Sequence, residues 1–317
     1  MTDRIIHGLS NEDYHNSEPY RQYLSSSQLK HYLRSPKAAK YTLDHPDTSK
    51  SDALRFGSLF HMAMELFQKH GTIDAFYDNV LIFRPPINEK TGKPYGSTTK
   101  VYAEAFARFL SDKGDKEIVT PEEAGLIEDM VGSLTNPSIG GATAVQVLKL
   151  LKWGKPEVSY FYETKDGIKL KVRPDLITRR KIVDWKTVAT DDLSEDSINR
   201  IILKYGYHIS AAMYQWVLHE ITGKWYDFIL VLVSKTEPYD CVMVDMGGYG
   251  YRYTEEYDLV SPGPGAMEFG RLLELHTTCV KNNHWPGAET FIPDNNGVRV
   301  LEIQPPRYYA NRFIEET

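Results

Sequence analysis

Residues 156–187 read PEVSYFYETKDGIKLKVRPDLITRRKIVDWKT, and this stretch decides the fold of the chain. Two of its segments, Val158–Glu163 and Ile168–Arg173, are rich in the β-branched and aromatic residues that favour strands. They are separated by Asp166-Gly167, a dipeptide typical of the short loop of a β-hairpin. We therefore expect an antiparallel pair of strands here.

A second hairpin follows, with Leu176–Thr178 and Lys181–Val183 on either side of Arg179-Arg180. If the two arginines form the loop, counting back along the strands places Asp175 opposite Asp184. A wider loop or a bulge would shift the pairing by one residue and rotate Asp175 away. Like charges directly opposite each other destabilise a strand pair. Two carboxylates in this position therefore indicate a cation between them, and a divalent metal that prefers oxygen ligands is the leading candidate.

The next residues add a third charged group. Side chains alternate along a strand, so Lys186 lies on the same face as Asp184, and Trp185 points the other way. Two carboxylates and an ammonium group on one patch are what metal-dependent phosphodiester hydrolysis needs. The alternative is a solvated surface hairpin in which Asp184 and Lys186 form an ion pair. The neighbouring apolar residues indicate a buried strand, and because charges are seldom buried without a partner or a task, they favour the functional interpretation.

These residues also carry a family resemblance. Arg173-Pro174-Asp175 followed by Asp184-Trp185-Lys186 resembles the PD-(D/E)XK nuclease signature, and the surrounding sequence is similar to the nuclease domain of RecE (exonuclease VIII) and related phage proteins. The resemblance runs from about residue 24 to residue 286. Its other segments are Leu24–Leu29 closing at Ser35-Pro36, Phe56–His61, Glu157–Ser159, Tyr205–His208 with Ala212–Tyr214, and Trp285-Pro286.

The resemblance implies an α/β fold: a PD-(D/E)XK core, with a mixed central sheet flanked by helices, and an N-terminal helical region. We expect one nuclease domain over residues 1–317, with residues 1–150 mainly helical, 151–245 forming the catalytic core and 246–317 forming a C-terminal helix and tail. Apolar spacing and turn residues predict helices at 55–68, 102–112, 121–134, 144–151, 209–221 and 266–280, and strands at 228–234 and 241–245.

Roles for individual residues follow from the same resemblance. The histidine of the family's G-x-x-x-H segment, His61 here, is a metal ligand, whereas a lone histidine on an apolar helix is more often part of a core. Glu157 is expected to be a third acidic group near the metal. The catalytic set is then Lys186, Asp184, Asp175 and Glu157, and the expected metal ligands are His61, Asp175, Asp184 and the backbone carbonyl of Trp185.

A helix after the catalytic strands is expected to contact substrate. Tyr207, Ser210 and Tyr214 share one of its faces. The family often carries a glutamine where this chain has Ser210, and the adjacent Gln215 points about 100° away around the helix. We expect Tyr214, Tyr207 and Arg173 to bind substrate.

Composition excludes several classes of protein. With 41% hydrophobic and 25% charged residues the chain has an ordinary globular composition. Its two cysteines cannot supply the four ligands of an iron–sulfur cluster, so we expect none, although some relatives of this core carry one. The first fifteen residues contain no apolar stretch of the kind found in leader segments, and no later run approaches a membrane span, so we expect a cytoplasmic protein of a bacterial or phage-infected cell.

The net charge of −6 is unusual for a protein that binds phosphates. Basic residues are nevertheless concentrated in and before the catalytic strands and between Lys90 and Lys100, where glycines predict a mobile loop. Acidic residues cluster elsewhere, at 191–196, 255–258 and 315–316. An acidic exterior with a basic channel is compatible with a nuclease that encircles DNA.

The resemblance implies a Mg²⁺-dependent exonuclease, with Mn²⁺ able to substitute. It would digest double-stranded DNA ends processively from 5′ to 3′, leaving 3′ single strands for recombination by a RecT-like annealing protein. A ring-shaped homo-oligomer is also implied. Two alternatives stay open at this point: a restriction-like or resolvase-like endonuclease with the same core, and a catalytically inactive DNA-binding module.

Overall fold

The computed structural model describes residues 5–46, 51–111, 114, 116–254, 256, 259–291 and 303–304. The chain divides into two compact units, one made of Met1–Ser26 with Asp47–Gly270 and the other of Ser27–Pro46 with Arg271–Thr317. All strands of the expected catalytic core lie in the first unit. The expectation of one nuclease domain over the whole chain stays a prediction.

The first unit is built on a mixed five-stranded sheet, in which β10 and β11 are parallel and the other neighbours antiparallel. Strand β11 is buried along nearly its whole length and lies inside the sheet, as its apolar sequence predicts. In spatial order the strands are β12 (Cys241–Asp245), β11 (Asp227–Ser234), β10 (Lys181–Val188), β9 (Leu176–Ile177) and β6 (Lys155–Pro156).

The register between β9 and β10 confirms the prediction from the sequence. Leu176 lies opposite Val183 and Ile177 opposite Ile182, as the arginine loop predicts, and Asp175 comes directly before the first paired residue of β9. The loop is the arginine pair, an unusual choice for a two-residue hairpin. The hydroxyl of Thr178 compensates by accepting the backbone N–H of Lys181 at 2.9 Å. This local hydrogen bond holds the register on which the arrangement of the two aspartates depends.

A second sheet of the same unit contains the first predicted hairpin. It consists of β1 (Ile5–Ile6), β7 (Ser159–Glu163) and β8 (Lys169–Val172), in the order β1-β7-β8. The loop has three residues rather than the Asp166-Gly167 pair, because the N–H of Thr164 already pairs with the carbonyl of Ile168 at 2.8 Å. Gly167, with φ of 80°, supplies the left-handed conformation that ends such a loop.

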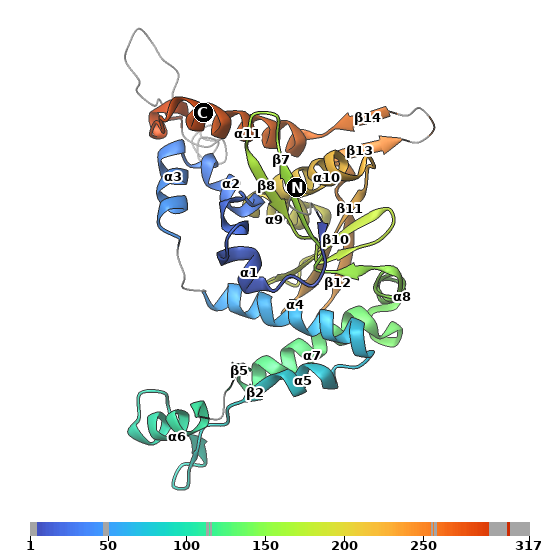
Figure 1. Ribbon diagram of the computed structural model, residues 1–317. Helices are drawn as coiled ribbons and strands as arrows, with labels where there is room; N and C mark the ends of the chain where they lie inside the picture. The colour runs from blue at the N-terminus through green and yellow to red at the C-terminus, as the bar shows by residue number, and fades with distance from the viewer. Residues whose placement is uncertain are drawn as a thin grey trace, which may run out of the picture. The chain divides into compact units, whose positions relative to one another are not determined.

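Helices cover both faces of the central sheet (Figure 1). The predicted helices are confirmed, with longer bounds except for the one predicted at 102–112, which spans Lys100–Leu110; residue 112 lies outside the described residues. Gly141, with φ of 55° and ψ of −133°, breaks α8 as the sequence indicates. Helices α1, α3, α5 and α9 were not predicted. The helices are α1 (Asn11–Asn16), α2 (Ser26–Leu29), α3 (Pro36–Asp44), α4 (Asp52–His70), α5 (Asp74–Asn79), α6 (Lys100–Leu110), α7 (Pro121–Thr135), α8 (Pro137–Trp153), α9 (Glu195–Tyr205), α10 (Tyr207–Thr222) and α11 (Pro264–Asn282).

The main core of the first unit lies between the sheet and the helices α4, α7 and α8. Phe60, Ile127, Met130, Val183 and Val231 are among its fully buried side chains, and Trp185 of β10 is 3% exposed. Helix α4 packs directly against β10. This contact brings a helix and a strand that are far apart in the sequence side by side at the candidate site.

The segment expected to be a mobile loop has defined structure. A short hairpin, β3 (Ile87–Asn88) with β4 (Lys93–Pro94), precedes α6. Figure 1 shows this hairpin and α6 extending from the pair formed by β2 (Val80–Ile82) and β5 (Glu117–Val119). One further hairpin joins β13 (Tyr251–Thr254) to β14 (Leu259–Pro262). In the described part of the chain, no helix combines the length and the apolar character needed to span a membrane.

Candidate metal centre and groove

His61 of α4 reaches across to the central sheet. Its Nδ1 lies 3.0 Å from a carboxylate oxygen of Asp175, and its Nε2 lies 3.0 Å from the backbone carbonyl oxygen of Trp185. Burial lowers the pKa of His61, but the Asp175 carboxylate outweighs this effect, and the pKa lies above its usual value. A ring with an acidic partner and 27% exposure of its side chain is not a core histidine packed among apolar groups.

Asp175, just ahead of β9, is held at both carboxylate oxygens. One oxygen faces His61, and the other accepts the backbone N–H of Trp185 at 2.7 Å. Burial alone would raise the pKa of Asp175, but His61 and Lys186 lower it below the usual value. Asp175 is therefore an oriented, ionised carboxylate.

Lys186 and Asp184 form the predicted same-face pair on β10. The Lys186 ammonium lies 2.6 Å from a carboxylate oxygen of Asp184 and donates to the Trp185 carbonyl at 3.1 Å. Although burial favours the neutral amine, Asp184 and Asp175 raise the pKa of Lys186 above its usual value. Burial raises the pKa of Asp184, and Lys186 opposes this shift. Lys186 is accordingly a cation at neutral pH.

Glu157, between β6 and β7, has a strained backbone. Its φ is 50°, a left-handed conformation that is uncommon for a residue with a side chain and that is often found at functional sites. Burial, followed by the nearby Asp175 carboxylate, raises the pKa of Glu157 to about 7. The guanidinium of Arg173 lies 3.5 Å from the Glu157 carboxylate and opposes this shift.

Two of the predicted ligands converge with Glu157, the acidic group expected near the metal. His61, Glu157 and Asp175 each offer one ligand atom, and these atoms lie within 4.8 Å of one another. An imidazole and two carboxylates, with the Trp185 carbonyl beside them, form a donor set that fits a divalent cation. Asp184 is not part of this group in the described structure, since its carboxylate is paired with Lys186. Its role as a ligand stays a prediction.

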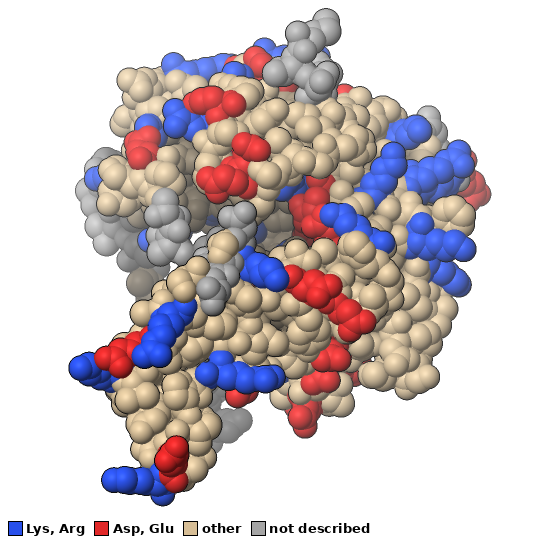
Figure 2. Space-filling model, turned by 60° about the horizontal axis from the view of Figure 1, so that its bottom comes forward, with Lys and Arg blue, Asp and Glu red and all other residues tan. Residues whose placement is uncertain are grey.

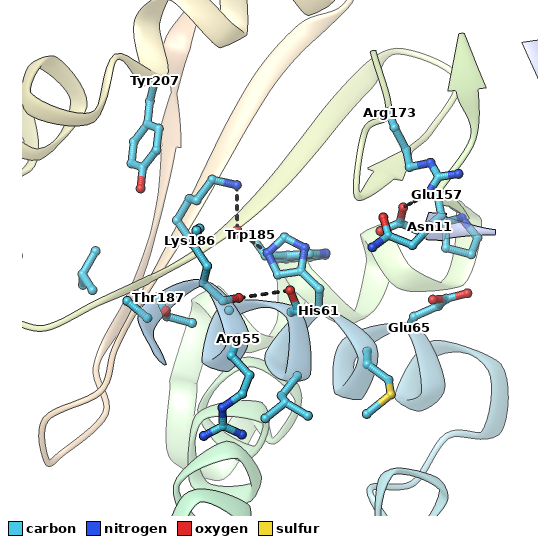
Figure 3. A pocket seen from close by; sticks show the side chains of 18 of the residues that line it. Asn11, Arg55, His61, Glu65, Glu157, Arg173, Trp185, Lys186, Thr187 and Tyr207 are labelled. Carbon is cyan, nitrogen blue, oxygen red and sulfur yellow. Dashed lines mark hydrogen bonds and ion pairs between the residues drawn. The ribbon is translucent and has the colours of Figure 1, made fainter. Parts of the chain in front are cut away.

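A groove of about 1750 Å³ opens above these residues. Its walls come from α4, α9, the end of β10 and residues 7–11 of the N-terminal segment. Figure 3 shows Lys186 and His61 directed towards Trp185, with Glu157 and Arg173 on one side and Tyr207 on the other. His61, Glu157 and Trp185 thus line a groove large enough for an extended ligand, whereas Asp175 lies behind them and lines a separate small cavity with all three.

The three residues predicted to bind substrate lie in different surroundings. Tyr207 lines the groove, with its ring 5.8 Å from the Lys186 ammonium. Arg173 reaches the groove edge but is only 8% exposed, because its guanidinium also donates to Ser159 and to the carbonyl of Leu9. Tyr214 does not line the groove, and its hydroxyl donates to the Arg173 carbonyl at 3.4 Å.

The side-chain amide of Gln215, on the same helix as these tyrosines, has a structural role. Gln215 is fully buried, and its side chain bonds the backbone of Tyr226 and Tyr251 at 2.8 Å. It therefore does not replace the glutamine that the family often carries where this chain has Ser210.

Helix α9 supplies groove residues that we did not identify from the sequence. Ser197, Arg200, Ile201, Lys204 and Tyr205 recur at helical spacing and all line the groove. The opposite face of α9 is buried at positions 198 and 202. This spacing and the helix-ending glycine at 206 were visible in the sequence, but the acidic run before the helix was interpreted only as a charged surface.

Surface charge is mixed on the face that Figure 2 displays. Figure 2 shows Lys and Arg side chains interspersed with Asp and Glu on the face it displays, with a group of basic side chains at the right-hand edge. This distribution agrees with the small negative net charge. Any attraction for phosphates therefore depends on local groups, such as the cations lining the groove.

Comparison with solved structures finds distant similarities over most of the chain. A proposed exonuclease from Eubacterium rectale is 18% identical with a TM-score of 0.47, covering 96% of this chain and 98% of the other. The structure of SSO0001 is 14% identical with a TM-score of 0.33, covering 86% and 82%. No curated protein matches the sequence. The profile of the PDDEXK-like domain of unknown function DUF3799 matches residues 25–288, and the chain belongs to this PD-(D/E)XK-like family.

Proposed function

We propose that this protein is a metal-dependent DNA nuclease that digests the ends of double-stranded DNA. The observation that carries the proposal is the convergence of His61, Glu157 and Asp175 beside the Asp184–Lys186 pair. Of these residues, His61, Glu157 and Lys186 line a groove. Membership of a PD-(D/E)XK-like family supports a nuclease. The arrangement suits phosphodiester hydrolysis because that reaction needs oxygen-rich metal ligands and a nearby cation.

The ion that we propose is Mg²⁺, with Mn²⁺ able to substitute. The ligands would come from His61, Glu157, Asp175 and the Trp185 carbonyl, with Asp184 as a further carboxylate. When bound, a divalent ion would acidify the attacking water and stabilise the charge that develops on the phosphate and the leaving oxygen.

Two side chains of the protein would orient the metal ligands and neutralise charge on the phosphate. Asp175 is fixed by the Trp185 N–H, so one oxygen keeps its direction towards His61. Because its raised pKa keeps Lys186 protonated, we propose that Lys186 neutralises charge on the phosphate and does not remove a proton from water. Lys186 would meet the phosphate by exchanging its contact with Asp184.

The finer features of the proposal come from the RecE-like resemblance. We propose processive 5′-to-3′ digestion that leaves a 3′ single strand, a RecT-like annealing protein as partner, a ring-shaped homo-oligomer, and action in the cytoplasm. Local cations along the groove support DNA as the substrate.

Linear duplexes labelled at the 5′ or the 3′ end, compared with covalently closed circles, test this function. With Mg²⁺, the wild type should release 5′-labelled mononucleotides first and leave the circles intact, and a chelator should stop the reaction. Early release of the 3′ label would reverse the polarity. Nicking or opening of the circles would indicate an endonuclease, and intact DNA in every case would indicate a binding module.

A further inference from the structure

The wall of the groove formed by α9 combines cations with exposed aromatic surface. Arg200 and Lys204 occupy the groove-facing stripe one turn apart, and Tyr205 follows with half of its surface exposed. The rings of Tyr205 and Tyr207 are stacked, with centroids 5.7 Å apart and planes 24° apart. The Lys204 ammonium lies 5.1 Å from the centre of the Tyr205 ring.

This wall leads to the reactive centre. Tyr207 is the inner member of the stacked pair, and its ring lies 5.8 Å from the Lys186 ammonium (Figure 3). A ligand lying along α9 would therefore meet Arg200 and Lys204 first, then the aromatic pair, and then Lys186. Cations that follow a phosphate backbone beside aromatic rings that stack bases are the pattern of single-strand binding.

We propose that α9 binds one DNA strand in single-stranded form, with a base stacked on Tyr205 and phosphates near Arg200 and Lys204. This inference rests on the proposed nuclease function and adds the form in which the strand reaches the site. A duplex fits this wall less well, because its internal bases are stacked on both faces and only its terminal pair could offer a ring face to Tyr205. A duplex end would have to separate before its strand followed α9.

Binding of a short fluorescein-labelled oligothymidylate, measured by anisotropy with Ca²⁺ in place of Mg²⁺, tests the proposal. Tyr205→Ala should weaken binding roughly tenfold or more, and Tyr205→Phe should keep it, since the ring and not the hydroxyl stacks. Arg200→Ala should lower the slope of log Kd against log salt by about 0.7, the value expected for one phosphate contact on a single strand.

Trp153 provides a matched control, because it is 73% exposed, has a lysine ammonium 5.2 Å from its ring and does not line the groove. Trp153→Ala should bind like the wild type. Unchanged binding by Tyr205→Ala, or equal loss in Trp153→Ala, would overturn the proposal. If the wild type cleaved no DNA with Mg²⁺, the nuclease function would fail instead, whatever the binding result.

A second inference comes from an independent feature of the opposite wall. Gly57 lies inside α4, one turn before His61, and lines the groove. A glycine in a helix interior is unfavourable compared with alanine. Within the described residues, no atom lies within 4 Å of the position that a Cβ would occupy, so packing inside the chain does not require glycine.

We infer that Gly57 leaves room for the sugar–phosphate backbone of the bound strand, which would lie directly against α4 beside His61. This inference also rests on the nuclease function. Gly57→Ala should raise the melting temperature by about 2–3 °C, because alanine is the better helix former. The same variant should lose tenfold or more in DNA cleavage and in oligothymidylate binding.

Gly125 of α7 is the matched control, since it is also inside a helix with no atom within 4 Å of a Cβ position, and it does not line the groove. Gly125→Ala should raise the melting temperature similarly and leave cleavage and binding unchanged. A Gly57→Ala variant that is stabilised and cleaves like the wild type would overturn the inference. Equal losses in both variants would do the same.

Discussion

The carboxylate of Asp175 accepts the backbone N–H of Trp185 at 2.7 Å, while its other oxygen faces His61 at 3.0 Å. One side chain therefore bonds the backbone of the central sheet and also contacts a candidate metal ligand. Replacing the charge without removing the hydrogen bond can separate these two roles.

Asp175→Asn should fold normally, because the amide oxygen can still accept the Trp185 N–H, but it should lose stabilisation by Mg²⁺ or Mn²⁺. Asp175→Ala should in addition lower the free energy of unfolding by about 1–3 kcal/mol, since the buried N–H then lacks its acceptor. Denaturant unfolding with and without metal measures both effects. Equal metal stabilisation in Asp175→Asn and the wild type would rule out a ligand role for this carboxylate.

Asp184 is predicted to be a ligand although its carboxylate pairs with Lys186 in this structure. A metal that binds only the native state raises the melting temperature as its concentration increases. We expect Asp184→Asn to lose most of this increase in a thermal-shift titration with Mn²⁺. If the variant gained as much as the wild type, Asp184 would only position Lys186.

Lys186→Ala should reduce DNA cleavage at least a hundredfold and leave folding and DNA affinity largely intact, because its ammonium would act on the reacting phosphate. Cleavage rates and fluorescence binding measure the two properties. Lys181 of the same strand is the control, since it forms a surface pair with Asp227 at 3.3 Å. Lys181→Ala should keep its activity. Near-normal turnover by Lys186→Ala would remove Lys186 from the mechanism.

His61→Ala should raise the Mg²⁺ concentration that gives half-maximal cleavage, because an imidazole ligand is lost. His219 is the contrasting histidine: its ring stacks on Trp225 with centroids 4.0 Å apart, and its Nδ1 is buried without a hydrogen-bond partner in the described structure. His219→Ala should change thermal stability without changing the metal requirement. If His61→Ala behaved in the same way, His61 would be a structural residue.

Lys171 predicts a pH dependence of stability. Its side chain is 2% exposed and donates to the carbonyls of Tyr14 and Tyr20, and burial, followed by Arg173, lowers its pKa to about 8. Between about pH 8 and the unfolded value near 10.4 the unfolded chain binds more protons. The free energy of unfolding therefore gains from this residue as pH rises through that window, by roughly 3 kcal/mol in total.

Denaturant unfolding of the wild type and Lys171→Met at pH 7.5, 9 and 10.5 isolates this contribution, because tyrosines that titrate in the same range are shared by both proteins. The free energy of unfolding of the wild type should rise relative to that of the variant. Parallel pH profiles would show that Lys171 keeps its ordinary pKa.

The side-chain alternation and loop lengths of strands were sufficient to predict the arrangement of the catalytic strands. Loop counting predicted the register of β9 with β10, and alternation placed Lys186 beside Asp184, because side-chain direction in a strand follows from register alone. Asp166-Gly167 predicted the position of the first hairpin loop but not its length of three residues, which ends at Gly167. Loop conformation depends on single φ values that a dipeptide pattern does not specify.

Contacts between side chains of different elements were harder to predict from the sequence. The spacing on β10 allowed both an ion pair of Asp184 with Lys186 and a ligand role for Asp184, and side-chain rotamers decide between them. The enclosure of Arg173 depends on the N-terminal segment reaching its guanidinium, and no spacing within one strand reports that contact. Helix α9 could have been predicted from the spacing of its apolar residues, because its buried positions 198 and 202 are both isoleucine.

The central claim is that metal-dependent phosphodiester hydrolysis occurs at Asp175 and its neighbours. The most direct measurement is the rate of nucleotide release from a linear duplex by the wild type and Asp175→Asn, each with Mg²⁺ and with a chelator. We predict release only by the wild type with Mg²⁺. Equal release by a correctly folded Asp175→Asn, or release by the wild type in the chelator, would contradict the account.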